Sequence, residues 1–225
     1  YQQLYDIPKS LGADVDLWEV EEDKGWLPDL DQLRRLIRPN TKMICINNAN
    51  NPTGALMDAA YLEELVAIAK EVDAYVFSDE VYRSFDQPAP SIVDLYAKGI
   101  AVNSLSKTYS IPGIRVGWVA SNTEVADILR DYRDYTMICA GVFDDMVATL
   151  VLENKEAILE RNRQIVEENL ALMDAWIAKE PKASWIRPAS VSTSFVKLDV
   201  NRPIEDFALE LLQDYGVLVV PGNRF

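Results

Sequence analysis

The chain has 225 residues, of which 49% are hydrophobic and 26% are charged, enough for one large domain with a core and part of a second. Its formal net charge of -14 argues against nucleic-acid or anionic-membrane partners, because proteins bind these negatively charged partners through basic patches. It contains no histidine, which excludes Ser-His-Asp triads and histidine-ligated metals, so we predict no metal site within these residues. We expect a cytoplasmic protein that acts on small molecules.

The first part of the sequence alternates between strand and helix patterns. Short apolar runs predict buried strands at residues 42–47, 74–80, 99–104 and 114–121. After the first strand, Asp58 is placed to cap a helix whose apolar residues recur every three or four positions, and another helix is predicted at 125–135. This alternation predicts an α/β fold, a three-layer α/β/α large domain with a mainly parallel sheet.

The pattern changes near residue 153. A long amphipathic helix is predicted at 153–180, followed by a strand at 192–200, a helix at 203–215 and a strand at 216–222. We therefore divide the chain into a large domain, residues 1–152, and a connector helix with part of a smaller α+β domain, residues 153–225. The two cysteines, Cys45 and Cys139, lie in apolar runs and are expected to be buried, reduced thiols.

Three of the predicted strands end in polar residues, namely Asn47, Asp79 and Ser104. In open α/β sheets, ligands bind outside the carboxyl ends of the strands. The sequence therefore predicts a ligand site at this edge of the sheet.

The segment SLSKTYSIPGIRVGW, residues 104–118, places a lysine and an arginine in a mostly uncharged stretch. Along an extended chain side chains alternate, so we expect Ser104 and Ser106 to point one way and Lys107 the other. Two hydroxyls and the Arg115 guanidinium suit a phosphate group, whereas Lys107 can condense with an aldehyde to form a Schiff base. Pyridoxal 5'-phosphate contains both groups, and we predict it as the cofactor.

Further residues can complete such a site. The pyridine nitrogen of this cofactor needs an acidic partner, and Asp79 lies at a neighbouring strand end. The 3'-oxygen of the ring needs donors, which Tyr82 and Asn51 can supply. Asn51 also has a turn role in any fold, because NNPTG is strong turn chemistry.

Three blocks in order, NNANNPTG at 47–54, SDEVY at 78–82 and SLSKTYSIPGIRVGW at 104–118, resemble the class I/II aminotransferases, the fold-type I pyridoxal-phosphate enzymes. The similarity extends over the whole chain. It implies an enzyme that moves an amino group between an amino acid and a 2-oxo acid, and a homodimer. It also implies an internal fragment, which lacks the family's glycine-bearing phosphate loop, its ring-stacking aromatic and the arginine that binds the substrate α-carboxylate.

The resemblance also implies roles for single residues. Lys107 would carry the cofactor as a Schiff base and transfer the proton between the substrate Cα and the cofactor. Asp79 would keep the pyridine nitrogen protonated, and Tyr82 and Asn51 would bind the 3'-oxygen, with Asn51 also touching the substrate carboxylate. The phosphate would be held by Ser104, Ser106 and Arg115.

The same site serves other reactions, so two alternatives stay open. One is a pyridoxal-phosphate lyase acting at Cβ, or a cyclising synthase. The other is an aminotransferase-like sensor domain of a transcription regulator. The substrate-side geometry that separates these functions lies mostly outside residues 1–225.

Overall fold

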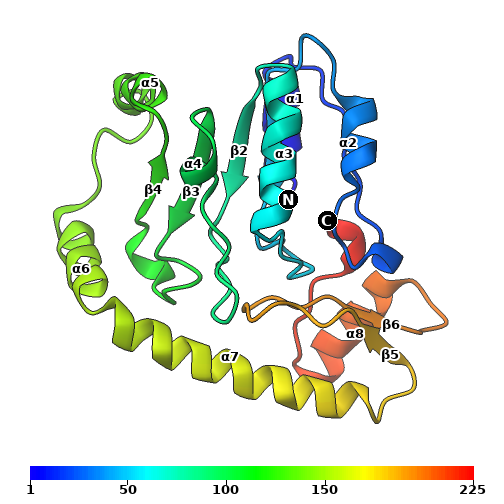
Figure 1. Ribbon diagram of the computed structural model, residues 1–225. Coiled ribbons are helices and arrows are strands. Elements are labelled where there is room, and N and C mark those ends of the chain that lie inside the picture. The colour runs from blue at the N-terminus through cyan, green and yellow to red at the C-terminus, as the bar shows by residue number, and fades with distance from the viewer.

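The computed structural model describes residues 1–225 and contains a four-stranded sheet flanked by helices (Figure 1). The strands are β1 (Met43–Asn47), β2 (Tyr75–Asp79), β3 (Gly99–Ser104) and β4 (Gly117–Ala120), and they lie side by side in sequence order. The first three are parallel, whereas β4 runs antiparallel to β3. The α/β class and the mainly parallel sheet predicted from the sequence are confirmed.

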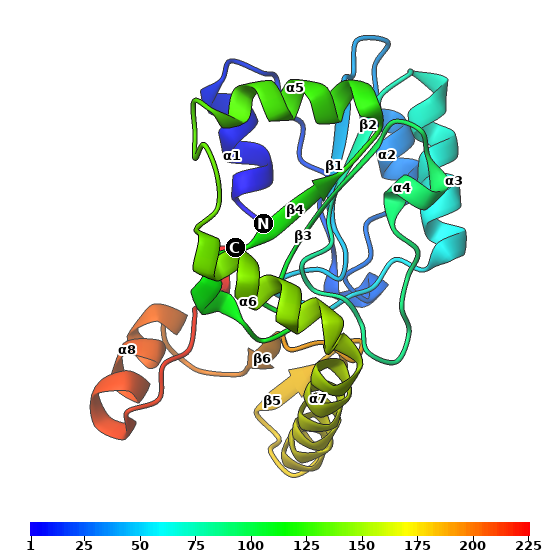
Figure 2. The ribbon, with the colours of Figure 1, turned by 90° about the vertical axis from the view of Figure 1, so that its left-hand side faces the viewer.

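Helices cover both faces of this sheet. Figure 2 shows α3 (Ala59–Glu71) and α4 (Ile92–Leu95) on one face and α1 (Gln3–Ser10) on the other. The remaining elements of this part are the helices α2 (Leu30–Leu36), α5 (Thr123–Arg133) and α6 (Val142–Glu153) and the 3-10 turns η1 (Glu22–Lys24) and η2 (Pro112–Ile114). None of the helices combines the length and the apolar character needed to cross a membrane.

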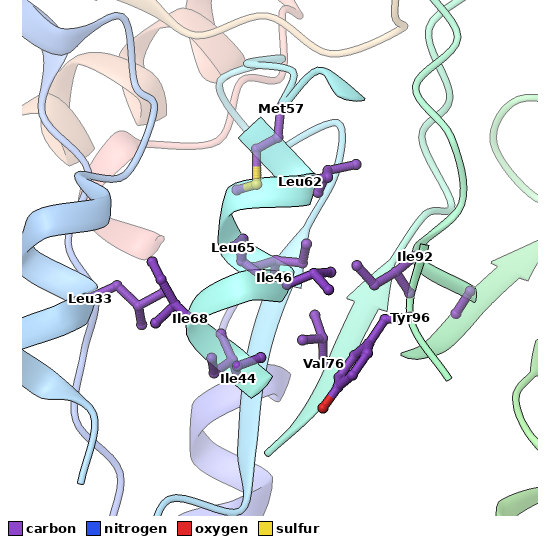
Figure 3. Close-up of a cluster of buried hydrophobic side chains, with 13 residues drawn as sticks. Leu33, Ile44, Ile46, Met57, Leu62, Leu65, Ile68, Val76, Ile92 and Tyr96 are labelled. Atoms are coloured by element: carbon purple, nitrogen blue, oxygen red, sulfur yellow. The ribbon is translucent and has the colours of Figure 1, made fainter. Parts of the chain in front are cut away.

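The main core lies between α3 and the sheet (Figure 3). Asp58 begins α3 as predicted, because its side chain accepts a hydrogen bond of 2.9 Å from the amide of Tyr61. The apolar face of the helix is then fully buried against alternate residues of the strands. The contacting side chains include Leu62, Leu65 and Ile68 of α3, Ile44 and Ile46 of β1, and Val76 of β2. This core fixes the strands whose carboxyl ends form the site.

The second part of the chain begins with the long helix α7 (Lys155–Ile177), which follows α6 after a break at Asn154. The break lies next to the domain boundary that we place between residues 152 and 153, and that division stays a prediction. A small antiparallel pair, β5 (Ala183–Trp185) and β6 (Val196–Leu198), follows, then α8 (Ile204–Tyr215) and the 3-10 turn η3 (Gly222–Arg224). The sequence patterns predicted neither α6 nor β5.

The strand predicted at 216–222 is wrong. No strand is present there, and the run from Val217 to Val220 is exposed. An apolar run becomes a strand only when another strand pairs with it, and within residues 1–225 none lies beside this one.

The cysteine prediction is half wrong. Both thiols are free, but Cys139 is exposed, because it follows α5 in a segment whose residues are all exposed. Cys45 in β1 is half-buried, and burial raises the pKa of its thiol to about 11.

Candidate functional site

The carboxyl ends of β1, β2 and β3 lie at one edge of the sheet, and in Figure 1 β2 and β3 run downward with their ends toward α7. Asn47, Asp79 and Ser104 are the last residues of the three strands, as the sequence predicted. The strand register pairs Asn47 with Asp79, and it pairs Asp79 with Val102, two residues before Ser104.

Asp79 is a half-buried carboxylate at the centre of this edge. Its Oδ1 accepts a hydrogen bond of 3.1 Å from the amide of Val81, and its second carboxylate oxygen has no protein partner. Burial raises the pKa of Asp79, and the hydrogen bond from the Val81 amide partly offsets that rise. A carboxylate with a free oxygen and no arginine or lysine paired to it is available to a ligand.

Asn47 joins the loop after β1 to the end of β2. Its Nδ2 donates to the Asp79 carbonyl at 3.1 Å, and its Oδ1 accepts from the Asn51 amide at 2.7 Å. The Asn51 side chain is half-buried and makes no hydrogen bond within the protein. Asn47 therefore positions the Asn51 backbone, a contact that the sequence analysis did not assign to it, although it placed Asn47 at the strand end.

Tyr82 and Lys107 come together at this edge. The Lys107 Nζ lies 5.6 Å from the centroid of the Tyr82 ring, and the amine has no ion pair or hydrogen bond within the protein. The backbone of Tyr82 is held by a hydrogen bond of 2.7 Å from the buried Ala49 amide to the Tyr82 carbonyl. The loop after β1 thus fixes the tyrosine, while the lysine amine stays free.

The predicted phosphate ligands are arranged differently from the sequence expectation. The strand β3 ends at Ser104, and the chain then turns, with the Ser106 amide donating to the Ser104 Oγ at 3.2 Å. The alternation expected for Ser106 and Lys107 is therefore wrong, because these residues are not extended. Both serine hydroxyls still lie at the end of β3, beside Lys107 in the chain, and the Ser106 hydroxyl makes no hydrogen bond within the protein.

Arg115 follows η2 and adopts a left-handed conformation, with φ of 53°. Its guanidinium is exposed and donates one hydrogen bond, of 2.9 Å, to the Pro112 carbonyl. No hydrogen bond joins it to Ser104 or Ser106, so the structure does not itself bring the three together around one point. The other guanidinium donors are uncommitted, which leaves them available for an anion.

Glu80, next to Asp79, is a buried carboxylate with a structural role. Its Oε1 accepts from the Ile92 amide at 2.9 Å and from the Ser91 hydroxyl at 3.1 Å, and its Oε2 pairs with Arg83 at 3.2 Å. Both carboxylate oxygens have partners within the protein, so Glu80 orders the loop that follows β2.

The residues at this edge fit pyridoxal 5'-phosphate by their chemistry. They offer an amine without a partner, a carboxylate with a free oxygen, a tyrosine hydroxyl and an asparagine amide without hydrogen bonds, and hydroxyl and guanidinium donors for a phosphate. A cavity of about 840 Å³ lies between α1, α2 and β1 and reaches the end of β1 at Asn47, but its mainly hydrophobic lining includes neither Lys107 nor Asp79. That cavity is not the candidate site.

The family model for aminotransferase class I and II matches residues 1–225. The chain belongs to this family. The class I/II resemblance predicted from the three sequence blocks is thereby confirmed, and so is the prediction of the cofactor, because the aminotransferases of this family depend on pyridoxal 5'-phosphate.

Three relatives show how far the similarity to other class I/II aminotransferases extends. The crystal structure of a PLP-dependent aminotransferase from Streptococcus suis superposes with a TM-score of 0.98 at 73% identity, covering 100% of this chain and 60% of that one. Glutamate-pyruvate aminotransferase AlaA of Escherichia coli is 32% identical over 91% of this chain and 55% of its own length. Capreomycidine synthase of Streptomyces vinaceus is 26% identical over 100% of this chain and 59% of its own length. The chain therefore spans little more than half the length of these relatives.

Proposed function

We propose that the protein containing these residues is a pyridoxal-phosphate-dependent aminotransferase that moves an amino group between an amino acid and a 2-oxo acid. The observation that carries the proposal is the unpaired Lys107 amine beside the Tyr82 ring, at the same sheet edge as a half-buried Asp79. Membership of the aminotransferase class I and II family supports it.

The cofactor, when bound, supplies an electron sink that stabilises negative charge on the substrate Cα. Lys107 holds it covalently through Nζ and afterwards moves the proton that leaves the substrate Cα. The free oxygen of Asp79 accepts a hydrogen bond from the protonated ring nitrogen. The hydrogen bond that the Val81 amide donates to Oδ1 fixes the orientation of that carboxylate.

The remaining predicted ligands bind and orient. The Tyr82 hydroxyl and the Asn51 amide donate to the ring oxygen, and Asn51 also contacts the substrate carboxylate. Ser104, Ser106 and Arg115 bind the phosphate, with the uncommitted guanidinium donors of Arg115 giving the charged contact.

The test is an assay of the purified protein at its full natural length with amino-acid donors and 2-oxo-acid acceptors. We expect a new amino acid and a new oxo acid in equal amounts. Pyruvate and ammonia released from a single amino acid, with no need for an acceptor, would instead show a lyase. Absence of both activities with every donor would contradict the enzymatic proposal.

A cyclising synthase is the second candidate, favoured by the match of capreomycidine synthase to the whole of this chain. The two candidates differ in the fate of the amino group, which a cyclising synthase retains in its product. Mass spectrometry of the products from an amino-acid donor labelled with ¹⁵N separates them, because transfer moves the label to the acceptor.

We also propose that the protein is a homodimer. The region from α5 to α6 exposes many large apolar side chains, among them Tyr135, Val142 and Phe143 at 86%, 74% and 83% exposure. Exposed apolar surface of this extent is typical of a face that another segment or chain covers, and a second copy of the chain is the occupant we propose. Light scattering on the full-length protein should give twice the chain mass, and a fully active monomer would contradict the proposal. The cytoplasmic location stays a prediction.

A further inference from the structure

Thr108, the residue after Lys107, has a hydroxyl that forms hydrogen bonds with the backbone of both residues flanking Tyr82. Its Oγ1 donates to the Val81 carbonyl at 3.0 Å and accepts from the Arg83 amide at 3.0 Å. Thr108 is 7% exposed, so water has little access to its hydroxyl. One hydroxyl therefore ties the segment that carries the lysine to the segment that carries the tyrosine.

The backbone of Thr108 is held in turn by α7. The Nδ2 of Asn162 donates to the Thr108 carbonyl at 3.0 Å. Asn162 is 4% exposed, and its Oδ1 accepts from the Arg161 guanidinium at 2.9 Å, so its amide is paired on both sides. The connector helix thus fixes the position from which the Thr108 hydroxyl reaches the Tyr82 segment.

We propose that Thr108 is a positioning residue that sets the Tyr82 hydroxyl relative to the Lys107 amine, and that Asn162 holds it in place from α7. This inference rests on the proposed function, because Tyr82 and Lys107 are there assigned to the cofactor. The Thr108 hydroxyl already bonds two backbone groups, so we assign it an indirect role through Tyr82. Tyr82 has only one other backbone anchor in this network, the bond from the Ala49 amide to its carbonyl.

The hydroxyl, rather than the shape of the side chain, is the feature that matters. Thr108→Val keeps the branched shape but leaves the partly buried Val81 carbonyl and Arg83 amide without their partner. We expect the dissociation constant of pyridoxal phosphate to rise about tenfold, because the Tyr82 segment then keeps only the Ala49 anchor and its hydroxyl is no longer held in position relative to the Lys107 amine. Thr108→Ser keeps the hydroxyl and should stay within about threefold of the unmodified protein.

The experiment is a double-mutant cycle on the full-length protein, with cofactor affinity measured by absorbance titration of the cofactor-free form. If Thr108 acts through Tyr82, Thr108→Val should change the affinity less than about twofold in a Tyr82→Phe background, where the positioned hydroxyl is already absent. Amide hydrogen exchange of the cofactor-free protein gives a second reading, because the Arg83 amide should lose protection in the valine variant and keep it in the serine variant. Thr41→Val is the matched control, since the Thr41 hydroxyl bonds only the Arg38 amide in a turn before β1.

The outcomes are distinct. Equal penalties for Thr108→Val with and without Tyr82→Phe, or a serine variant as weak as the valine variant, would overturn the positioning role. A control variant that loses affinity as strongly as Thr108→Val would do the same, because the loss would then reflect general destabilisation. If the unmodified full-length protein binds no cofactor at all, the proposed function fails, and the exchange of the Arg83 amide still reports on the Thr108 contact.

Discussion

Arg115 is expected to govern how tightly the cofactor is retained rather than how fast the chemistry proceeds. Its guanidinium is exposed and uses one donor on the Pro112 carbonyl, so the rest can form a fork with a phosphate. The phosphate stays in place throughout turnover, and an interaction that is equal in the ground and transition states changes binding only. Arg115→Ala should therefore weaken cofactor binding and leave turnover nearly intact once the cofactor is saturating.

The magnitude follows from the two phosphate hydrogen bonds that an alanine cannot form. Hydrogen bonds to a charged group contribute about 1.5 kcal/mol each when taken at the low end of their range, which suits an exposed side chain. Removing both, about 3 kcal/mol, corresponds to a cofactor dissociation constant raised by roughly 10²-fold. The backbone contributes little to this difference, because alanine and lysine at this left-handed position carry the same kind of strain as arginine. Arg115→Lys should be intermediate, since it keeps the charge and lacks the planar fork.

The assay is a cofactor titration of the full-length protein and both Arg115 variants, followed by turnover at saturating cofactor. Arg35→Ala is the control, an arginine of α2 that forms no ion pair and lies outside the site. If Arg115→Ala holds the cofactor as tightly as the unmodified protein, the phosphate binds elsewhere. If it binds weakly and stays inactive at saturation, Arg115 also positions reacting groups, and a role in binding alone is refuted.

Asp79 supports two further predictions. Asp79→Asn should bind the cofactor but lower the turnover by about 10² to 10⁴-fold, because an amide stabilises a protonated ring nitrogen less than a carboxylate by about 3 to 5 kcal/mol, and near-normal turnover would remove Asp79 from its assigned role. Without cofactor at pH 7, the same variant should melt at a higher temperature than the unmodified protein. This difference in melting temperature should shrink as the pH falls toward 4. The expected direction of this difference follows from the raised pKa of Asp79 in the folded protein. The stability that protonated Asp79 contributes is complete below pH 3.8, the ordinary pKa of the group, and it is lost as the pH rises through the pKa of the folded protein. Equal melting temperatures of the two proteins at pH 7 would show that ionisation of Asp79 does not destabilise the fold.

Local signals in the sequence predicted the scaffold of the site well. The cap at Asp58 and the spacing of Leu62 and Leu65 lie within one helix, and each strand leading to the site is a short apolar run ended by a polar residue. Such patterns depend on neighbours in the chain, so one sequence is enough to identify them. The three blocks that resemble the family then supplied the roles of Lys107 and Asp79.

Contacts between distant segments could not be predicted in this way. The expected alternation of Ser106 and Lys107 failed because the chain turns after β3, where the Ser110 amide bonds to the Lys107 carbonyl and the Ile111 amide bonds to the Leu105 carbonyl. The Thr108 hydroxyl bonds to a carbonyl 27 positions earlier, and its own carbonyl is held from a helix 54 positions later. No spacing in the sequence encodes these two bonds, which depend on how the loops and α7 pack.

The most direct test of the central claim is the identity of the lysine that carries the cofactor. Borohydride reduction of the full-length protein makes the bond between cofactor and lysine permanent, and peptide mapping by mass spectrometry then locates it. The structure leaves the Lys107 amine unpaired beside Tyr82, and the account predicts one label per chain, on Lys107. A label on another lysine, or no label on a folded full-length protein saturated with pyridoxal phosphate, would contradict the account.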